Sequence, residues 1–431
     1  MRRLRRSVSL PLASAMALAV NLMPALAAQD TAADWPRFRG PGGLGVSPAK
    51  GLPVAWGPQE NVAWKTELPG PGASSPIVVG ERVFLTCYSG YGVQGQPGGS
   101  MDELKLHVVC LNANDGKIRW TKDIEPKLPE QANPREGHGY ASHTPVADPE
   151  RLYVFFGKSG VYAFDHGGKQ LWAADVGSKT NGWGSAASPI LAGDLVIVNA
   201  SVESESLVAL DRKTGKEVWR ARGIRESWNT PILVSLANGN TELAVAIAGK
   251  VLGFDPASGE ALWSCATDIG WYMVPGLVAD KGIIYCIGGR SGVAALAVRA
   301  GGRGDVTASH RLWKGQKGSN VSSPIIHGGH LYWAHENTGT VYCAVAKTGD
   351  IVYEQKLERA GQFYPSPVLA DGKLYYTNRG GRTYVLAAKP GFQLLATNEI
   401  EPRGAFNSSP AVAGRRLFLR SNRFLYCVES K

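Results

Sequence analysis

The side chains best suited to chemistry in this sequence stand in glycine- and serine-rich stretches rather than in apolar runs. Three of them, His138, Tyr140 and His143, share one such stretch. Two histidines in one loop could share a metal ion, and a histidine can act as a general base near neutral pH. A zinc site needs further ligands, and a hydrolase needs a nucleophile with an oxyanion partner. The sequence shows neither beside this pair, so we predict no metal site and no catalytic residue.

Aromatic and amide side chains occupy the corresponding stretches farther along the chain. Aromatic rings can stack on a planar ligand such as a quinone or on a sugar ring, and amides can orient it. The same side chains could receive an inserted peptide segment, or could fill a channel and pair with loop backbone. Together with the three residues above, the binding candidates are Trp183, Trp228, Asn229, Trp271, Tyr272, Asn320, Tyr364, Phe406 and Asn407.

Three acidic residues in the same stretches, Glu226, Asp268 and Glu336, are the candidates for binding calcium or accepting a proton. Calcium takes roughly six to eight oxygen ligands, and the sequence reveals no converging set of acids and amides. For each of the three acids we favour the interpretation of a solvated turn residue.

The elements that must position these side chains repeat along the chain. Prolines that mostly follow Ser, Thr or Val lead into short apolar runs, at spacings of 69, 44, 42, 44, 49, 43 and 43 residues. The copy at 185–219 holds three apolar runs too short for helices and a tight turn at 211–215. A period near 43 residues made of four antiparallel strands is typical of a β-propeller with one blade per copy. The anchors are Pro76, Pro145, Pro189, Pro231, Pro275, Pro324, Pro367 and Pro410.

A large apolar residue follows the turn glycine of most copies by four positions. A ligand touches one place, whereas this position recurs in copy after copy, so we predict packing between neighbouring blades rather than ligand binding. The residues at this position are Trp120, Trp172, Trp219, Trp263, Tyr353 and Leu395, with Trp313 after a longer turn.

The last copy stops at Lys431, one strand short of a blade. The segment 61–65 resembles a closing strand and precedes the first copy. We therefore predict an all-β protein, an eight-bladed β-propeller of four-stranded antiparallel blades over 61–431, with the last blade closed by an N-terminal strand. Such closure removes the open sheet edges. Residues 28–60 are expected to form an extended N-terminal segment.

Residues 1–27 are predicted to be a signal peptide. Four arginines precede an apolar stretch that ends in the small-residue cleavage pattern at 25–27. A retained membrane anchor is the alternative, although Asn21 and Pro24 interrupt the stretch. We expect export without a retained membrane span, and the sequence leaves open whether the general secretory or the twin-arginine route is used.

The charge balance bears on the partners. Formal net charge is +10, and it falls to +6 without residues 1–27, which carry four arginines and no acid. Because this surplus is mild and no dense basic run or nucleic-acid motif is present, we predict that the protein binds no nucleic acid. We expect a monomer.

Six cysteines in an exported chain suggest disulfides, but the repeat argues against most of them. Three fall on a third-strand position that other copies fill with Ala, Gly or Val, where cysteine serves as a small apolar residue. These three are Cys110, Cys343 and Cys427. A bridge between Cys87 and Cys110 stays open, as does the state of Cys265 and Cys286.

The units at 110–120 (CLNANDGKIRW), 163–172 (AFDHGGKQLW) and 209–219 (ALDRKTGKEVW) resemble the repeat of the pyrroloquinoline-quinone-like (PQQ-like) propellers over nearly the whole exported chain. The resemblance implies eight blades. One branch of that superfamily, the quinoprotein dehydrogenases, holds PQQ and calcium at the propeller centre. A second is the non-enzymatic scaffold lipoprotein of outer-membrane β-barrel assembly, BamB. The segments 35–41 and 182–189 look most like a third set, exported propellers common in planctomycete-like bacteria.

The sequence departs from the first two branches. Quinoprotein alcohol dehydrogenases usually carry two adjacent cysteines against the cofactor, and no two cysteines are adjacent here. The scaffold lipoprotein requires a cysteine just after its signal, whereas the first cysteine here is Cys87. We therefore expect a chain that is not lipidated.

These observations favour a non-catalytic binding or scaffold protein in the periplasm or cell envelope. Its expected partner is an envelope protein or polymer, or a small planar or sugar ligand, and no cofactor is predicted. The alternative is a PQQ- and calcium-dependent dehydrogenase of alcohols or sugars. In that case Trp183, Trp228 or Trp271 would stack on the quinone, and a nearby acid would accept the substrate's proton.

Overall fold

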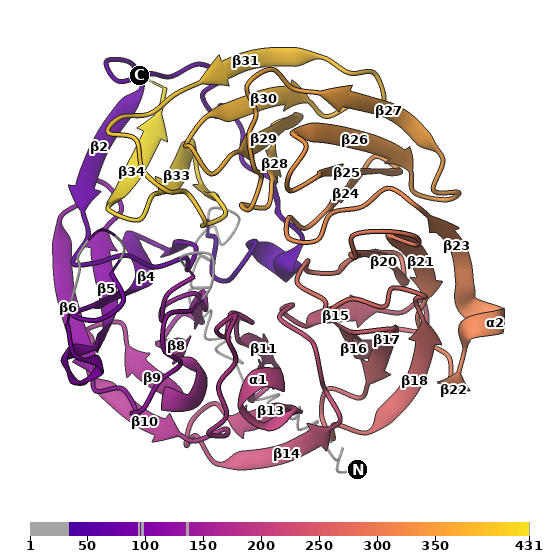
Figure 1. The fold of residues 1–431 in the computed structure, drawn as a ribbon, viewed down its shortest axis with the longest axis horizontal. Coiled ribbons are helices and arrows are strands. Elements are labelled where there is room, and N and C mark those ends of the chain that lie inside the picture. Colours follow the sequence, from indigo (N-terminus) through magenta and orange to yellow (C-terminus); the bar gives the residue numbers. More distant parts are fainter. Residues whose placement is uncertain (1–33, 94, 96–98, 135–137, 431) are drawn as a thin grey trace, which may run out of the picture. The chain divides into compact units, whose positions relative to one another are not determined.

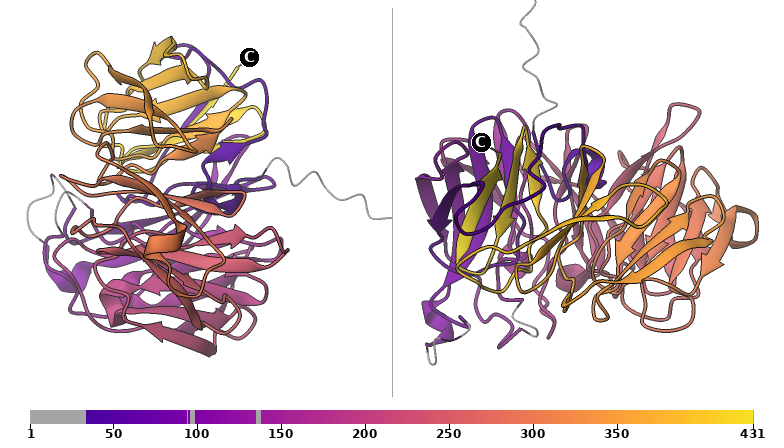
Figure 2. Two further views of the ribbon diagram at one scale, coloured as in Figure 1. Left: turned by 90° about the vertical axis from the view of Figure 1, so that its right-hand side faces the viewer. Right: turned by 90° about the horizontal axis from the view of Figure 1, so that it is seen from above.

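Eight antiparallel sheets follow one another around a central channel in the computed structural model, which describes residues 34–93, 95, 99–134 and 138–430 (Figure 1). The predicted signal peptide lies outside the described residues. In the first seven blades the first strand in sequence lies innermost, and in the eighth β32 lies innermost and the N-terminal strand β2 outermost (Figure 1). Figure 2 shows the ring edge-on, with the connections between strands gathered on its two faces. The predicted eight-bladed propeller is confirmed.

The strands are short and mostly β-branched or aromatic, as a pleated, half-buried surface favours. Blades one to four contain β3 (Ile77–Val79), β4 (Arg82–Ser89), β5 (Lys105–Asn112) and β6 (Ile118–Ile124); β7 (Val146–Ala147), β8 (Arg151–Phe155), β9 (Val161–Asp165) and β10 (Gln170–Ala174); β11 (Ile190–Ala192), β12 (Leu195–Ala200), β13 (Ser206–Asp211) and β14 (Glu217–Arg222); and β15 (Ile232–Ser235), β16 (Thr241–Ile247), β17 (Lys250–Phe254) and β18 (Ala261–Ala266). Blades five to eight contain β19 (Val278–Asp280), β20 (Ile283–Ile287), β21 (Ala295–Arg299) and β23 (Arg311–Gly315); β24 (Ile325–His327), β25 (His330–Ala334), β26 (Thr340–Val345) and β27 (Ile351–Lys356); β28 (Val368–Ala370), β29 (Lys373–Thr377), β30 (Thr383–Ala387) and β31 (Leu394–Asn398); and β32 (Ala411–Ala413), β33 (Arg416–Arg420) and β34 (Phe424–Glu429).

The last blade is completed from the N-terminal side, as predicted. Strand β2 (Val62–Glu67) pairs antiparallel with β34, and Trp64 lies opposite Cys427. Two further short strands extend other blades: β1 (Val46–Ser47) runs parallel to β28, and β22 (Gly304–Asp305) runs parallel to β18. The short helical segments are η2 (Pro41–Gly43), η3 (Met101–Glu103), η5 (Gly157–Ser159), α1 (Ser201–Ser204) and α2 (Thr307–His310).

Most outer-strand tryptophans join neighbouring blades, which confirms their predicted packing role, whereas the indole of Trp263 donates to Glu242 of its own blade at 2.7 Å. In five blades the indole Nε1 donates to a backbone carbonyl of the next blade at 2.9–3.2 Å. Each ring also covers the turn glycine there, where a Cβ would approach the indole to 2.5–2.9 Å. The five are Trp64, Trp120, Trp172, Trp219 and Trp313.

Blade seven departs from the predicted pattern. Its register places Ala396, not Leu395, opposite Val385, and Leu395 is 38% exposed. The space that a tryptophan fills in other blades is taken by Trp56 from the N-terminal segment, whose ring lies 6.3 Å from that of Tyr375. The turn before the outer strand of blade seven is one residue longer than in most other blades. Counting four residues from the turn glycine therefore points to Leu395 instead of Ala396.

Blade five departs in its anchor. In the other seven blades the first strand begins at the residue after the proline, whereas β19 begins at Val278, three residues after Pro275. Leu277 therefore takes the anchor place of that blade, and Gly276 takes the place that Ser or Thr holds elsewhere.

All six cysteines are buried free thiols. The third-strand position predicted for three of them is confirmed, because each lies opposite the outer aromatic residue of its blade. Cys87 lies opposite His107 and Cys110 opposite Phe84, so the two cysteines of blade one are not cross-strand neighbours. Among the helices of the described chain, none has the length and apolar character needed to cross a membrane.

Candidate functional site

The N-terminal segment runs along the inner edges of several blades and lines the channel at Phe38. Trp35 exchanges backbone hydrogen bonds of 2.8 and 2.9 Å with Val78 in blade one, and Ala147 of blade two donates to the carbonyl of Pro36 at 2.8 Å. The segment then reaches blade seven as β1. These contacts satisfy backbone groups that inner strands would otherwise leave unpaired. Figure 1 shows this indigo segment near the centre of the ring.

Two arginines of this segment are buried in the channel wall. Arg37 donates to the carbonyl of Pro231 at 3.3 Å, and Arg39 donates to the carbonyls of Leu44 at 3.1 Å and of Pro324. Burial lowers the pKa of Arg37 to about 10 and that of Arg39 to about 9, so both stay protonated at neutral pH. Phe38 lies between them and faces the channel space.

Seven hydroxyl groups form a ring above Phe38. A backbone N–H of one blade donates to the hydroxyl of the next, at 2.8–3.0 Å. The ring is open only at Gly276, in blade five. With Phe38 it lines a cavity of about 130 Å³, which we call the cup. The members of this hydroxyl ring are Ser75, Thr144, Ser188, Thr230, Ser323, Ser366 and Ser409.

The cup continues into a second space of about 110 Å³ with aromatic walls, which we call the vestibule. Five residues border both spaces, and the vestibule adds four more. The shared residues are His138, Trp228, Val274, Val321 and Tyr364, and the added ones are Trp183, Tyr272, Arg290 and Asn320. We use the term channel-mouth face for the face of the ring on which the vestibule lies.

The structure brings seven of the predicted candidates to these two spaces. Six of them border the vestibule, and Asn407 lines the cup. The six are His138, Trp183, Trp228, Tyr272, Asn320 and Tyr364. Trp271 lies beside them, 38% exposed, with its ring centroid 5.2 Å from that of Tyr272 and the Arg290 guanidinium 5.0 Å away.

His143 and Tyr140 do not reach the cup or the vestibule. His143 is buried between blades two and three, with Nε2 2.9 Å from the Ser185 hydroxyl and its ring 4.4 Å from that of Phe155. Burial lowers the pKa of His143 to about 3. Tyr140 donates to the carbonyl of Gln131 at 2.7 Å. These two side chains support loops rather than the channel mouth.

Asn229 and Phe406 are also structural. The Asn229 amide bonds the Ser227 hydroxyl and both backbone groups of Ala246, and the residue is 1% exposed. Phe406 stacks on Tyr426 in the core, at a centroid distance of 6.0 Å. An amide with this many backbone partners is fixed in place and has little left for a ligand.

The cup and vestibule are lined by hydroxyl, amide, imidazole and aromatic groups. No Asp or Glu of the described chain lines either space. Asp268 pairs instead with Arg311 and Lys314 at 2.9 and 2.8 Å. Glu336 is 4% exposed and accepts the backbone N–H of Asn320 at 2.9 Å, so the interpretation of Glu336 as a solvated turn residue is wrong.

His138 is the imidazole of the site. Its Nδ1 lies 2.6 Å from the Ser142 hydroxyl. Burial lowers the pKa of His138 to about 4, so the ring is neutral at physiological pH. A neutral imidazole can donate or accept one hydrogen bond on each nitrogen, according to its tautomer.

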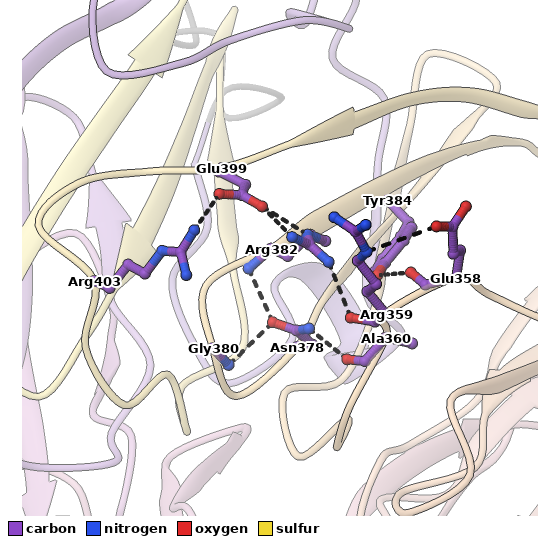
Figure 3. Close-up of polar contacts among 9 residues, drawn as sticks. All are labelled: Glu358, Arg359, Ala360, Asn378, Gly380, Arg382, Tyr384, Glu399 and Arg403. Carbon is purple, nitrogen blue, oxygen red and sulfur yellow. Dashed lines mark hydrogen bonds and ion pairs between the residues drawn. The ribbon is translucent and has the colours of Figure 1, made fainter.

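A polar network holds the rim on the side of blade seven (Figure 3). Glu399 pairs with Arg382 and, at 2.7 Å, with Arg403, while the Asn378 side chain accepts the backbone N–H of Arg382 at 2.9 Å. These contacts fix the turn that carries Arg379. The guanidinium of Arg379 lies 4.2 Å over the Tyr364 ring.

Beside this rim a larger groove of about 560 Å³ extends over blades eight and one. Arg379 and Asn407 line it, joined at 3.0 Å, and Asn407 also lines the cup. Arg423 and Asn422 continue the groove away from the channel. A ligand in the cup could therefore extend along the surface.

Several of these features escaped the sequence reasoning. In the sequence the hydroxyl ring appears only as a Ser or Thr before the anchoring prolines. That pattern indicates the repeat but does not reveal the hydrogen bonds between blades. The sequence did not predict that Phe38 and Arg290 line the channel. Their positions depend on the paths of the N-terminal segment and of a blade-five loop. In the described part of the chain, no group of three or more His, Cys, Asp or Glu is placed to hold a metal ion.

Comparison with known families adds a sequence match. Residues 105–355, more than half of the chain, match the family model described as outer membrane protein assembly factor BamB. A polyvinylalcohol dehydrogenase from a Pseudomonas species is 28% identical over 190 residues, which cover 40% of this chain and 26% of that protein. The chain thus spans about a quarter of the length of this curated relative.

Solved structures share the fold at low identity. BamB from Moraxella catarrhalis is 15% identical with a TM-score of 0.59, over 86% of this chain and 98% of that one. Quinohemoprotein alcohol dehydrogenase from Comamonas testosteroni is 12% identical with a TM-score of 0.66, over 93% of this chain and 81% of that one. At these identities the likeness concerns the propeller itself.

Proposed function

Because the chain belongs to the family of the outer membrane protein assembly factor BamB, we propose that it is an exported, non-catalytic binding protein of the periplasm or cell envelope. It acts through the channel-mouth face. The observation that carries this proposal is the shape of the channel: the N-terminal segment lines it at Phe38, and it continues into an aromatic vestibule beside a groove of about 560 Å³. A concave site with aromatic walls and a few oriented polar groups is a typical binding site.

The lining supports binding rather than catalysis. General base catalysis needs a group whose pKa lies near the working pH, and burial holds the pKa of His138 at about 4. The hydroxyls of the cup already accept backbone N–H groups, and no described carboxylate is placed to activate one of them. The groups that remain can orient a ligand by hydrogen bonds and stacking.

Capture of envelope components tests this proposal. We expect that replacing Trp271 and Tyr272 together with alanine lowers recovery of a partner from envelope extract at least about tenfold, because exposed aromatic side chains are frequent anchors of binding sites. Phe392→Ala is the matched control, since Phe392 is 37% exposed on the outer side of blade seven. Equal recovery with the double variant and with the control would reject the channel-mouth face as the binding surface.

Export is a separate part of the proposal. Residues 1–27 lie outside the described residues, so cell fractionation must test it. The full chain should appear in the periplasmic fraction, shortened at about residue 27, and a chain lacking 1–27 should stay in the cytoplasm. Full-length protein in the cytoplasm would contradict export.

A PQQ- and calcium-dependent dehydrogenase remains the second candidate, favoured by the aromatic walls of the vestibule. The residues present fit it only in part. Trp228 and Trp183 offer surfaces for a planar ring. Calcium and the proton-accepting base of such an enzyme call for carboxylates, and among the residues described none lines the cup or vestibule. Titration with PQQ, with and without calcium, separates the candidates: saturable, calcium-dependent stabilisation would favour the dehydrogenase.

A further inference from the structure

Three arginines are buried near the channel, although none of them lines the cup. Arg37 and Arg39 flank Phe38 of the cup lining in sequence and are 8% and 1% exposed. Arg420, also 1% exposed, donates to the carbonyl and hydroxyl of Ser74 at 2.6 Å and to the carbonyl of Thr86 at 2.8 Å. Their acceptors are backbone carbonyls, the hydroxyl of Ser74 and the thiol of Cys87. None of the three has a carboxylate partner within the described chain.

Such burial is unusual, because a charged group removed from water is costly unless an opposite charge compensates it. Backbone carbonyls satisfy some of the N–H groups but leave each net charge in place. Arg37 Nε, Arg39 Nε and Nη1, and Arg420 Nε have no acceptor in the described structure. Glu336 accepts the backbone N–H of Asn320 and lines neither of the two spaces. Three buried guanidinium groups without a carboxylate partner make the potential near the channel more positive.

The hydroxyl ring adds hydrogen-bond donors to this field. Each hydroxyl oxygen accepts a backbone N–H of the preceding blade. In the described structure none of the seven donates to another protein atom, so their O–H groups are available to a ligand. Seven O–H groups around a space of about 130 Å³ suit a compact group rich in acceptor oxygens.

The vestibule also contains a positively charged group. Arg290 lines it with its guanidinium over the Trp271 ring, and the remaining walls are aromatic, aliphatic or amide groups and the neutral imidazole of His138. A ring or chain attached to the bound group would pack against these walls, while its charge lies in the cup.

We propose that the cup binds a negatively charged group, a carboxylate or a phosphate, at the end of the ligand of this protein. The vestibule packs against the part of the ligand that carries this group. The inference rests on the proposed function, since it specifies the ligand chemistry of the same face. The buried guanidinium groups do not line the cup, so they would favour such an anion through their charge, while the hydroxyl ring would donate hydrogen bonds to it.

The first test compares probes that differ in charge at equal ionic strength. D-glucuronate and D-glucose share a ring and differ at the carboxylate, and inorganic phosphate supplies the anion without a ring. We expect calorimetric binding and a raised melting temperature with glucuronate, a smaller effect with phosphate, and none with glucose. Affinity for glucuronate should fall as salt rises. Equal effects of glucose and glucuronate, or no effect of either anion, would overturn the inference.

Variants then locate the site. Ser366→Ala removes one hydroxyl of the ring and should weaken glucuronate binding several-fold. Because this change leaves the backbone N–H of Ser323 without its acceptor, Arg290→Gln on an exposed side chain serves as a second variant that should fold normally and also weaken binding. Arg119→Gln, on the outer strand of blade one, is the matched control. Weakening by the control alone, or by none of the three, would place the anion elsewhere.

The two proposals fail in different ways. If alanine at Trp271 and Tyr272 abolishes partner capture while neither anion binds, the binding face stands and the anion inference is rejected. The opposite outcome is that glucuronate binds, that Arg290→Gln weakens this binding, and that alanine at Trp271 and Tyr272 leaves partner capture unchanged. In that case the cup is an anion site and the partner proposal fails.

Discussion

At the scale of single residues, the molecule keeps a carboxyl group buried beside a neutral histidine. Glu203 on α1 is 2% exposed and shares a small polar cavity with His143, Ser185, Lys158 and Lys179. Burial raises the pKa of Glu203 from an ordinary 4.5 to about 7, and the hydroxyl of Ser185 opposes this only in part. Lys158 lines the same cavity but forms no ion pair with Glu203, because it donates to the carbonyl of Pro129 instead.

This raised pKa predicts a pH-dependent stability. The folded state holds the proton more tightly than the unfolded state, so the contribution of Glu203 is fully present below pH 4.5 and is lost as pH rises through about 7. The difference corresponds to about 3 kcal/mol. Glu203→Gln should therefore gain stability relative to the native chain between pH 5 and pH 8, in denaturant titrations. His143 stays neutral over this window because its pKa is about 3. Exposed Glu217→Gln is the control, and parallel pH curves for Glu203→Gln and the native chain would disprove the prediction.

The residue scale also shows how far sequence reasoning about the site could go. Trp183, Trp228 and Tyr364 could be predicted because each lies in a loop before the first strand of a blade, and these loops border the channel mouth. The position of a residue in such a loop does not predict the direction of its side chain. Asn229 sits in such a loop, yet its amide turns inward because the backbone of Ala246 offers both a donor and an acceptor. The hydroxyl ring was found only as a sequence marker, since its function depends on neighbouring blades meeting at hydrogen-bond distance.

At the scale of elements, the N-terminal segment supplies a part that blade seven lacks. In blades two and five a tyrosine of the second strand contacts the tryptophan of the outer strand, as in Tyr153 with Trp172 at 5.9 Å between centroids. In blade seven Tyr375 holds the same register, and its partner is Trp56, 6.3 Å away. Asn398 fixes Trp56 by accepting its backbone N–H at 3.1 Å.

We therefore expect Trp56→Ala to destabilise the propeller by about 3–5 kcal/mol, the usual range for removing a buried tryptophan side chain. The reason is a cavity between blades seven and eight, since Trp56 is 4% exposed. Equilibrium unfolding in guanidinium chloride measures the loss. Trp271→Ala, at an exposed tryptophan, should change stability by less than about 1 kcal/mol. A similar small loss for both variants would show that Trp56 does not serve as the missing tryptophan.

The strands were predicted better in blades with the regular repeat length than in blades where a turn is longer or a strand begins later. The closing strand was found because 61–65 carries the same pattern as the outer strands, with Trp64 in the tryptophan place. Blade seven was misread at Leu395 because counting from a glycine assumes a turn of constant length. No local pattern linked Trp56 to Tyr375, because that contact joins segments more than 300 residues apart in sequence.

At the scale of the whole molecule, the chain ends close the ring, and this closure predicts how it unfolds. Strand β2 pairs with β34, and its Trp64 donates to the carbonyl of Ala113 in blade one at 3.2 Å, so one strand joins the last blade to the first. A chain lacking residues 28–67 would leave β34 as an open edge and both neighbouring blades without their joint.

We expect this shortened chain to lose the single cooperative transition of the native protein, to melt at a lower temperature, and to associate through the exposed edge, which calorimetry and light scattering would record. A peptide spanning 60–68 should raise the melting temperature in part by adding back the strand, although it leaves out Trp56 and β1. The same peptide with Trp64→Ala should raise the melting temperature less, because it can pair with β34 but cannot join blade one. If the shortened chain melts like the native protein, or if both peptides act equally, the ring does not depend on this joint, and the blades fold with more independence than a closed propeller implies.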